Sequence, residues 1–247
     1  MYTSYIVVLL VAILSFFIKS ATGFGNALVM VPLLTMTVGI RHAIIVAALV
    51  DLVGGLILFV RNPVHDSRKF WAPMAAGMVA GSIIGGIVLG FVPVAGFKRV
   101  LGGVIVILGG WFMAGRGGRD GSSLPETPPE RAAVSDIAVS SFSGFCGGLF
   151  GMSGPPIVYH LGRKLAKTAF RSTLIAVFVF AGFARVSTYA VTGLIDADAL
   201  LMGLSALPGM MIGLYLGHHL FIRIEEIWFA RFVGLVLAGS GIRLFLG

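Results

Sequence analysis

The uncharged apolar runs of this chain constrain its fold more than any other feature. Four of them cover residues 2–18, 70–97, 137–162 and 199–222. A helix crosses the hydrocarbon core of a bilayer with roughly 20 apolar residues. Helices satisfy their own backbone hydrogen bonds in lipid, and the runs lack the ~10-residue alternating segments of a membrane β-barrel. The sequence therefore predicts an all-α polytopic membrane protein embedded in a lipid bilayer.

The charge balance has a membrane explanation as well. Only 11% of the residues are charged, against about 25% in a soluble domain, and the net charge is +8. Basic residues gathered on the cytoplasmic loops of membrane proteins produce such an excess. We therefore expect no nucleic acid among the partners.

A single long polar stretch divides the chain nearly in half. It reads RGGRDGSSLPETPPER and has the Gly, Pro and Ser content of a linker. We predict one membrane domain, 1–247, made of repeat one (1–115), a cytoplasmic linker (116–132) and repeat two (133–247). Laying the second half over the first places Gly151 on Gly23 and Gly209 on Gly81.

Each half shows the same order of apolar segments. We expect them at 2–19, 24–39, 42–60, 70–92 and 98–115, and at 134–149, 154–165, 169–192, 198–220 and 226–246. The first two of each half are short. A helix over 134–165 would extend only ~48 Å, which is too little for two full crossings of a ~30 Å core. Each half is thus predicted to begin with a Gly/Pro-broken or re-entrant helix pair, followed by three transmembrane helices.

Loop charges favour two inverted repeats. If each broken pair enters and leaves on one side, or crosses twice, one face collects eleven basic residues and the other four, whereas a single crossing splits them seven against eight. The positive-inside rule favours the first arrangement. The eleven are Arg61, Arg68, Lys69, Arg116, Arg119, Arg131, Arg163, Lys164, Lys167, Arg171 and Arg223. Inverted repeats with broken helices are typical of secondary transporters.

Two motifs resemble those of a known family. The segments ATGFGNALVMVPLL and FCGGLFGMSGPPIVYHL, together with the duplicated layout, are similar to the sulfite exporter TauE/SafE family, also called toluene-sulfonate uptake permeases. The resemblance implies a carrier of sulfite or organosulfonates in the bacterial cytoplasmic (inner) membrane, with seven or eight spans. Asn26 and Ser153 stand where that family usually has Gly, and they add hydrogen-bonding side chains at the breaks.

The two breaks are the candidate substrate site. A helix that restarts inside the membrane points free N–H groups and a partial positive charge at the gap, which suits an oxyanion. Glycine allows close backbone approach, and hydroxyl and amide groups add donors. The competing interpretation is tight helix packing through small residues. The candidate residues are Thr22, Gly23, Gly25, Asn26, Gly151, Ser153 and Gly154.

Two basic residues are further candidates for substrate binding. Lys19 lies beside the first break, where an intramembrane charge would bind an anion. Alternatively, its stem extends along a helix end toward the interface. Arg185 binds substrate through its planar fork, pairs with Asp51, or approaches the outer interface.

Asp51 and His160 are the candidates for proton coupling. Asp51 is the one acid deep in an apolar segment, and it serves as a proton site, an ion-pair partner, or a polar group facing a vestibule. His160 follows the second break and is either a neutral ring bonded to a carbonyl or a proton relay. We expect no metal and no cofactor, because His218 and His219 diverge by about 100° on a helix and no nucleotide motif is present.

The sequence thus predicts a secondary transporter and not an enzyme. The expected substrate is a small sulfur-containing anion such as sulfite, thiosulfate or an organosulfonate, moved by alternating access with a coupled proton or cation. The alternatives are an anion channel, a membrane subunit without a transport role, and an intramembrane enzyme. The last would need Asp51 and His160 within reach of each other.

Overall fold

A computed structural model describes residues 2–61, 68–113, 125, 127–220 and 239. The regular elements in this part of the chain are all helices, as the sequence predicts. They are α1 (Tyr2–Thr22), α2 (Asn26–Val38), α3 (Ile40–Arg61), α4 (Arg68–Phe91), α5 (Val94–Met113), α6 (Val134–Phe150), α7 (Gly154–Gly162), α8 (Lys167–Val191) and α9 (Ala197–Leu220). The predicted segment 226–246 and most of the predicted linker lie outside the described residues.

Four of the described helices are long and apolar enough to cross a membrane by length and composition. They cover Ile40–Arg61, Arg68–Phe91, Thr168–Val191 and Ala197–His219. Ser4–Ser20, Asn26–Val38 and Val134–Phe150 are shorter apolar helices. A multi-pass, all-helical membrane protein is therefore the class that both sequence and structure support.

Glycine makes both predicted breaks. In the first break, between α1 and α2, Gly23 and Gly25 have φ angles of 82° and 93°. In the second, between α6 and α7, Gly151 has φ 76° and its N–H donates to the Gly147 carbonyl at 3.0 Å. A side chain is strained in this left-handed region, so the helices end where glycine permits the turn.

The helix bounds of the two halves match closely. When Gly151 is aligned with Gly23, the end of α6 falls on the end of α1, and the start of α7 falls on the start of α2. In the same alignment, the starts of α8 and α9 fall next to those of α3 and α4. The helix ends at the two breaks therefore recur at the spacing read from the sequence, and the Gly23 and Gly151 pair recurs with them.

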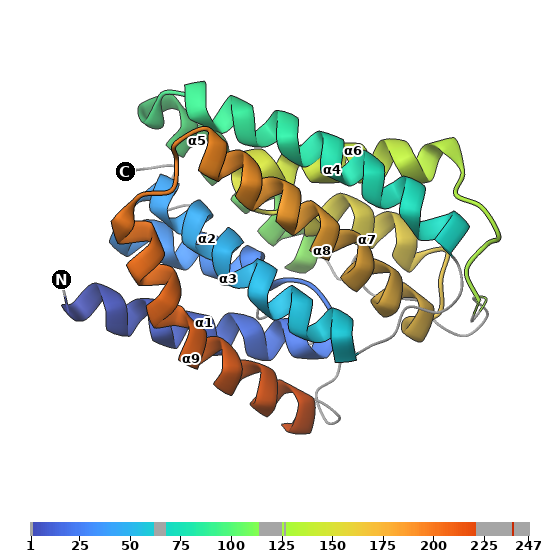
Figure 1. The fold of residues 1–247 in the computed structure, drawn as a ribbon, viewed down its shortest axis with the longest axis horizontal. Coiled ribbons are helices and arrows are strands. Elements are labelled where there is room, and N and C mark those ends of the chain that lie inside the picture. The colour runs from blue at the N-terminus through green and yellow to red at the C-terminus, as the bar shows by residue number, and fades with distance from the viewer. Residues whose placement is uncertain (1, 62–67, 114–124, 126, 221–238, 240–247) are drawn as a thin grey trace.

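The long helices pack across the two halves. α1 packs along α9 and α4 along α6, while α3 and α8 lie between these two pairs (Figure 1). Both outer pairs approach closely at glycine. A Cβ on Gly81 of α4 would overlap the Ser141 carbonyl oxygen, and one on Gly209 of α9 would overlap that of Leu9. These small residues allow backbone-to-backbone packing where lipid gives no hydrophobic driving force between helices.

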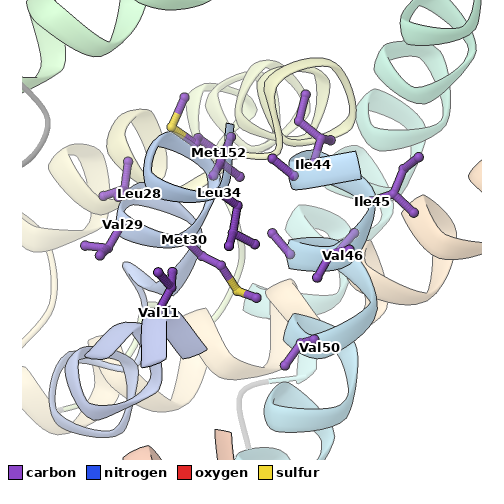
Figure 2. Packing of buried hydrophobic residues seen from close by; sticks show 14 of the residues in the cluster. Val11, Leu28, Val29, Met30, Leu34, Ile44, Ile45, Val46, Val50 and Met152 are labelled. Atoms are coloured by element: carbon purple, nitrogen blue, oxygen red, sulfur yellow. The ribbon is translucent and has the colours of Figure 1, made fainter. Parts of the chain in front are cut away.

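The first break is held by an apolar core. Figure 2 shows side chains of α2, among them Met30 and Leu34, packing between Val11 of α1 and Val46 of α3. Met152, from the second break, belongs to the same buried cluster. The core of the first half thus includes the tip of the second hairpin, which fixes the two breaks relative to each other.

Candidate functional site

The two helix breaks meet at one pocket. A Cβ on Gly154 would lie 3.4 Å from the Phe24 ring, so the tips of the two hairpins are in contact. The pocket is small, with a cavity volume of about 20 Å³. Its lining comes from both breaks and from α3 and α8: Lys19, Phe24, Gly25, Asn26, Ala27, Leu28, Asp51, Met152, Ser153, Gly154 and Phe178.

Three charged side chains form a buried group at this pocket. The Asp51 carboxylate is paired with the Lys19 ammonium through Oδ1 and with Arg185 Nη2 through Oδ2, the latter at 2.9 Å. The Lys19 and Arg185 side chains are only 3% and 5% exposed. Lys19 therefore points into the protein and does not extend to the interface, and Arg185 takes the pairing with Asp51 that the sequence left open.

The buried group carries one more positive than negative charge. Two cations share the single Asp51 carboxylate, so one formal positive charge lies without a counter-ion among the described residues. Arg185 lies behind Asp51 and is absent from the pocket lining; its Nη1 reaches the Gly147 carbonyl at 3.5 Å. A buried net charge is costly unless a partner neutralises it.

Two donors near the excess charge are buried without a partner. They are the Asn26 amide nitrogen Nδ2 and the Arg185 Nε. Asn26 lies next to the Asp51 carboxylate, but Nδ2 makes no hydrogen bond of normal geometry within the described protein. Buried side-chain donors are rarely left unpaired, so such groups need an explanation.

Both restarting helices direct their N-termini at the pocket. α2 begins at Asn26 and α7 at Gly154, and neither has a side-chain cap at its first turn. Their free N–H groups carry partial positive charge. Pro155 and Pro156 remove two of these donors from α7, and the next N–H, that of Ile157, donates to Ser143 Oγ at 3.0 Å. The first break therefore offers more free backbone donors than the second.

Two glycines predicted to bind substrate do not line the pocket. Gly23 and Gly151 lie behind the pocket: a Cβ on either would be 3.0 Å from Arg171 Cγ or Val31 Cγ2, respectively. They shape the breaks and do not line the cavity. The side chain of Thr22 lies outside the described residues.

His160 lies in a separate polar cluster. Its Nε2 is 2.6 Å from Asp136 Oδ1, and Lys164 Nζ is 2.5 Å from the same oxygen. Asp51 pairs instead with Lys19 and Arg185. The intramembrane enzyme alternative required Asp51 and His160 to act together, and the structure gives each of them different partners. No group of three or more potential metal ligands occurs in the described part of the chain.

Sequence reasoning missed several residues of the site. Phe178 and Met152 form apolar walls of the pocket, and Arg171 donates from Nη2 to the Ser20 carbonyl at 3.0 Å, near the end of α1. Asp136, of the separate polar cluster, was also missed, because an acid in the first turn of a helix is common and usually only caps it. Phenylalanine and methionine carry no signal either, because apolar residues are common throughout the chain.

The fold and the pocket define a multi-pass membrane protein with a buried cavity between two helix breaks, next to a charged group that carries one excess positive charge. A comparison with protein families then gives the particular family: the model of sulfite exporter TauE/SafE matches residues 8–244, and the chain belongs to this family.

One curated relative matches over most of its length. It is described as a probable sulfite/organosulfonate exporter TauE of Cupriavidus necator. The two are 27% identical over 208 residues, which cover 81% of this chain and 78% of the relative. No solved structure matches the chain.

Proposed function

We propose that this protein is a secondary transporter that carries a small sulfur-containing anion, sulfite, thiosulfate or an organosulfonate, across the bacterial cytoplasmic membrane. One observation carries the proposal. A pocket between two helix breaks is lined by Lys19 and Asp51 and has an unpaired amide donor on its wall, and Arg185 pairs with the same carboxylate from outside the lining, so two buried cations share one acid. A bound oxyanion would supply both the missing negative charge and the missing acceptor. Family membership and the printed description of the relative support the same substrate class.

Each group of the pocket has a distinct task in this proposal. Asn26 Nδ2 and the free N–H groups at the start of α2 donate to the anion oxygens, and Lys19 supplies the positive charge. Asp51 fixes the positions of both cations, since it pairs with each of them. Arg185 acts through Asp51 and not as a direct ligand, because it lies outside the pocket lining. The aromatic and methionine side chains exclude water and accept the apolar part of an organic sulfonate.

Alternating access by two inverted repeats is the motion we propose. The matched helix bounds, the two broken pairs and the packing of α1 on α9 and of α4 on α6 support it. In such carriers two related halves rock around a fixed site near the midplane. A channel would need a continuous pore, and its flux would not saturate with substrate concentration.

Uptake of labelled anions into proteoliposomes tests the proposal. Sulfite, thiosulfate, sulfoacetate and taurine serve as probes, and we expect saturable flux of at least one. Lys19→Gln keeps the Asp51–Arg185 pair but removes the excess charge, and Asn26→Ala removes the unpaired donor. Each is expected to raise KM about tenfold or more, because hydrogen bonds to charged groups contribute ~1.5–3 kcal/mol.

Lys69→Gln is the matched control, since this lysine is 68% exposed and pairs only with Glu130, at 3.7 Å, among the described residues. Its KM should equal that of the unchanged protein. Absence of flux with all four probes would overturn the proposed function. An unchanged KM in Lys19→Gln would remove Lys19 from the site.

A further inference from the structure

We propose that the cluster Asp136, His160 and Lys164 is the proton-binding site that couples transport to a pH gradient, separate from the anion pocket. The inference rests on the proposed transport function. The sequence offered Asp51 and His160 as candidates for this role. The arrangement around each of them favours His160 and adds Asp136 as its partner.

The cluster is built around one buried carboxylate. The Asp136 side chain is 3% exposed, and its Oδ2 accepts from the Ala133 N–H at 2.8 Å. Its Oδ1 is shared by His160 Nε2 and Lys164 Nζ. An ionised carboxylate only accepts hydrogen bonds, so Nε2 is the protonated nitrogen of the ring. Nδ1 has no hydrogen-bond partner among the described residues, and it is the atom that would take up a proton.

Proton uptake at His160 would reproduce the arrangement seen at Asp51. A neutral ring leaves Asp136 balanced by Lys164 alone, whereas a charged ring places two cations around one carboxylate. Histidine is the side chain that ordinarily changes charge between pH 5 and 8. The His160 ring is 20% exposed, so water can deliver the proton, and the step adds one charge without any further reactant.

The cluster is mechanically connected to the anion pocket through α7. His160 lies near the end of this nine-residue helix, and Gly154, at its start, lines the pocket. A helix of this length extends about 13 Å and moves as one unit. Asp136 lies in the first turn of α6, so the cluster holds the base of the hairpin whose tip contacts the anion site. A change of charge at the base therefore biases the position of the tip.

The other charged groups at this end are engaged elsewhere or exposed. Lys69, at the start of α4, pairs with Glu130, and Arg163 donates to the Tyr159 hydroxyl at 2.7 Å. Arg68 and Arg131 are exposed. Among the described side chains, Lys164, which follows the end of α7, is the one that shares the Asp136 carboxylate with His160.

The first hairpin has no equivalent cluster. In the alignment of the two halves, the counterparts of the three cluster residues are Val8, Pro32 and Met36, which cannot bind a proton. Asp51, the competing candidate, holds Lys19 and Arg185 together. A proton on Asp51 would leave two cations facing each other without a counter-ion, unless the anion arrives at the same time.

Two transport measurements on the full chain separate coupling from binding. One is exchange of labelled against unlabelled anion at equal pH on both sides, and the other is accumulation driven by a pH gradient. We expect His160→Gln to retain exchange and to lose gradient-driven accumulation. His42→Gln is the matched control, because His42 pairs with Asp196 at 3.0 Å outside this cluster. It should retain both activities.

The outcomes are distinguishable. If accumulation driven by the pH gradient persists in His160→Gln, the inference is wrong. It is also wrong if Asp51→Asn loses this accumulation but retains exchange, while His160→Gln keeps both. Exchange without any gradient effect in the unchanged protein overturns coupling but leaves the transport proposal standing. A failure of exchange with every probe overturns the transport proposal instead.

Proton binding itself has a readout that does not depend on transport. NMR of the protein labelled at its five histidines should show a ring signal that shifts with pH and that is missing from the spectrum of His160→Gln. If the His160 ring does not titrate between pH 5 and 8, the inference is wrong whatever the flux measurements give.

Discussion

The two hairpins, α1–α2 and α6–α7, break at matching positions but place their charges at opposite ends. The first carries Lys19 and Asn26 at its tip, where the second has Gly147 and Gly154. The second carries its charged cluster at the base, where the first is apolar. Two hairpins with a similar break thus bear two different sets of polar groups.

This difference shows what two hairpins of similar backbone leave free to vary. Both halves need glycine at the breaks and where two helices approach closely, because the backbone conformation or the close contact at these points leaves no place for a side chain. The polar side chains are needed only once each, because both tips line a single pocket. The comparison therefore separates the residues that build the frame from those that carry charge.

Removing Asp51, the acid that pairs with Lys19 of the first hairpin, should have the largest effect. Asp51→Ala leaves Lys19 and Arg185 buried without a counter-ion, and we expect the free energy of unfolding to fall by about 3–5 kcal/mol. Thermal unfolding in detergent measures the loss. Adding Lys19→Met to the Asp51 variant removes one of the stranded cations and should recover part of it. Equal stability of Asp51→Ala and the unchanged protein would contradict the ion-pair account.

Alanine at the glycines where two helices touch should destabilise the α4–α6 pair and the α1–α9 pair to a similar extent. A Cβ on Gly81 would overlap the Ser141 carbonyl, so Gly81→Ala should cost about 1–3 kcal/mol, and Gly209→Ala a similar amount. Gly90→Ala is the control, since nothing lies within 4 Å of its added Cβ. The melting temperatures of the three variants measure these losses of stability. A loss at only one of the two contacts would show that the two helix pairs are not packed in the same way.

Two serines at matched positions should behave differently. Ser143 Oγ accepts the buried Ile157 N–H, so Ser143→Ala leaves that donor unpaired and should cost about 1–3 kcal/mol. Ser15, its counterpart in the first hairpin, only donates to the Val11 carbonyl at 2.6 Å within its own helix, and Ser15→Ala should stay within about 0.5 kcal/mol. Denaturation of both variants in the same micelles measures the difference, and equal losses would show that the two hairpin tips are held in the same way.

A small, pH-dependent effect is expected outside both hairpins and gives a baseline. The Ala199 N–H, with help from His42, lowers the pKa of the Asp196 carboxyl at the start of α9. Asp196→Ala should cost about 1 kcal/mol, the usual contribution of a helix cap. Because the folded pKa is lowered, this contribution is present above the unfolded pKa of ~3.9 and is lost as the pH falls through the folded value. Melting curves between pH 3 and 7 should show this dependence and its reduction in the variant.

Much of the frame was predictable from residues that act locally. Runs of apolar residues place the long helices, and glycines and prolines place the breaks, so the predicted bounds agree with the observed ones to within a few residues. The candidate site was predictable only in outline. Phe178 contributes to the pocket wall solely because α8 passes beside the two tips, and no local pattern marks that position.

By itself, the sequence determined the class of protein, the two breaks and their spacing, because apolar length, glycine and proline act through the backbone of their own segment. Only the tertiary structure decided which charges meet. Lys19, Asp51 and Arg185 lie on three helices, and their pairing depends on how α1, α3 and α8 pack. The same holds for Asp136 and His160, which the α6–α7 turn brings together. Electrostatic partners are set by distance in space, which local sequence does not encode.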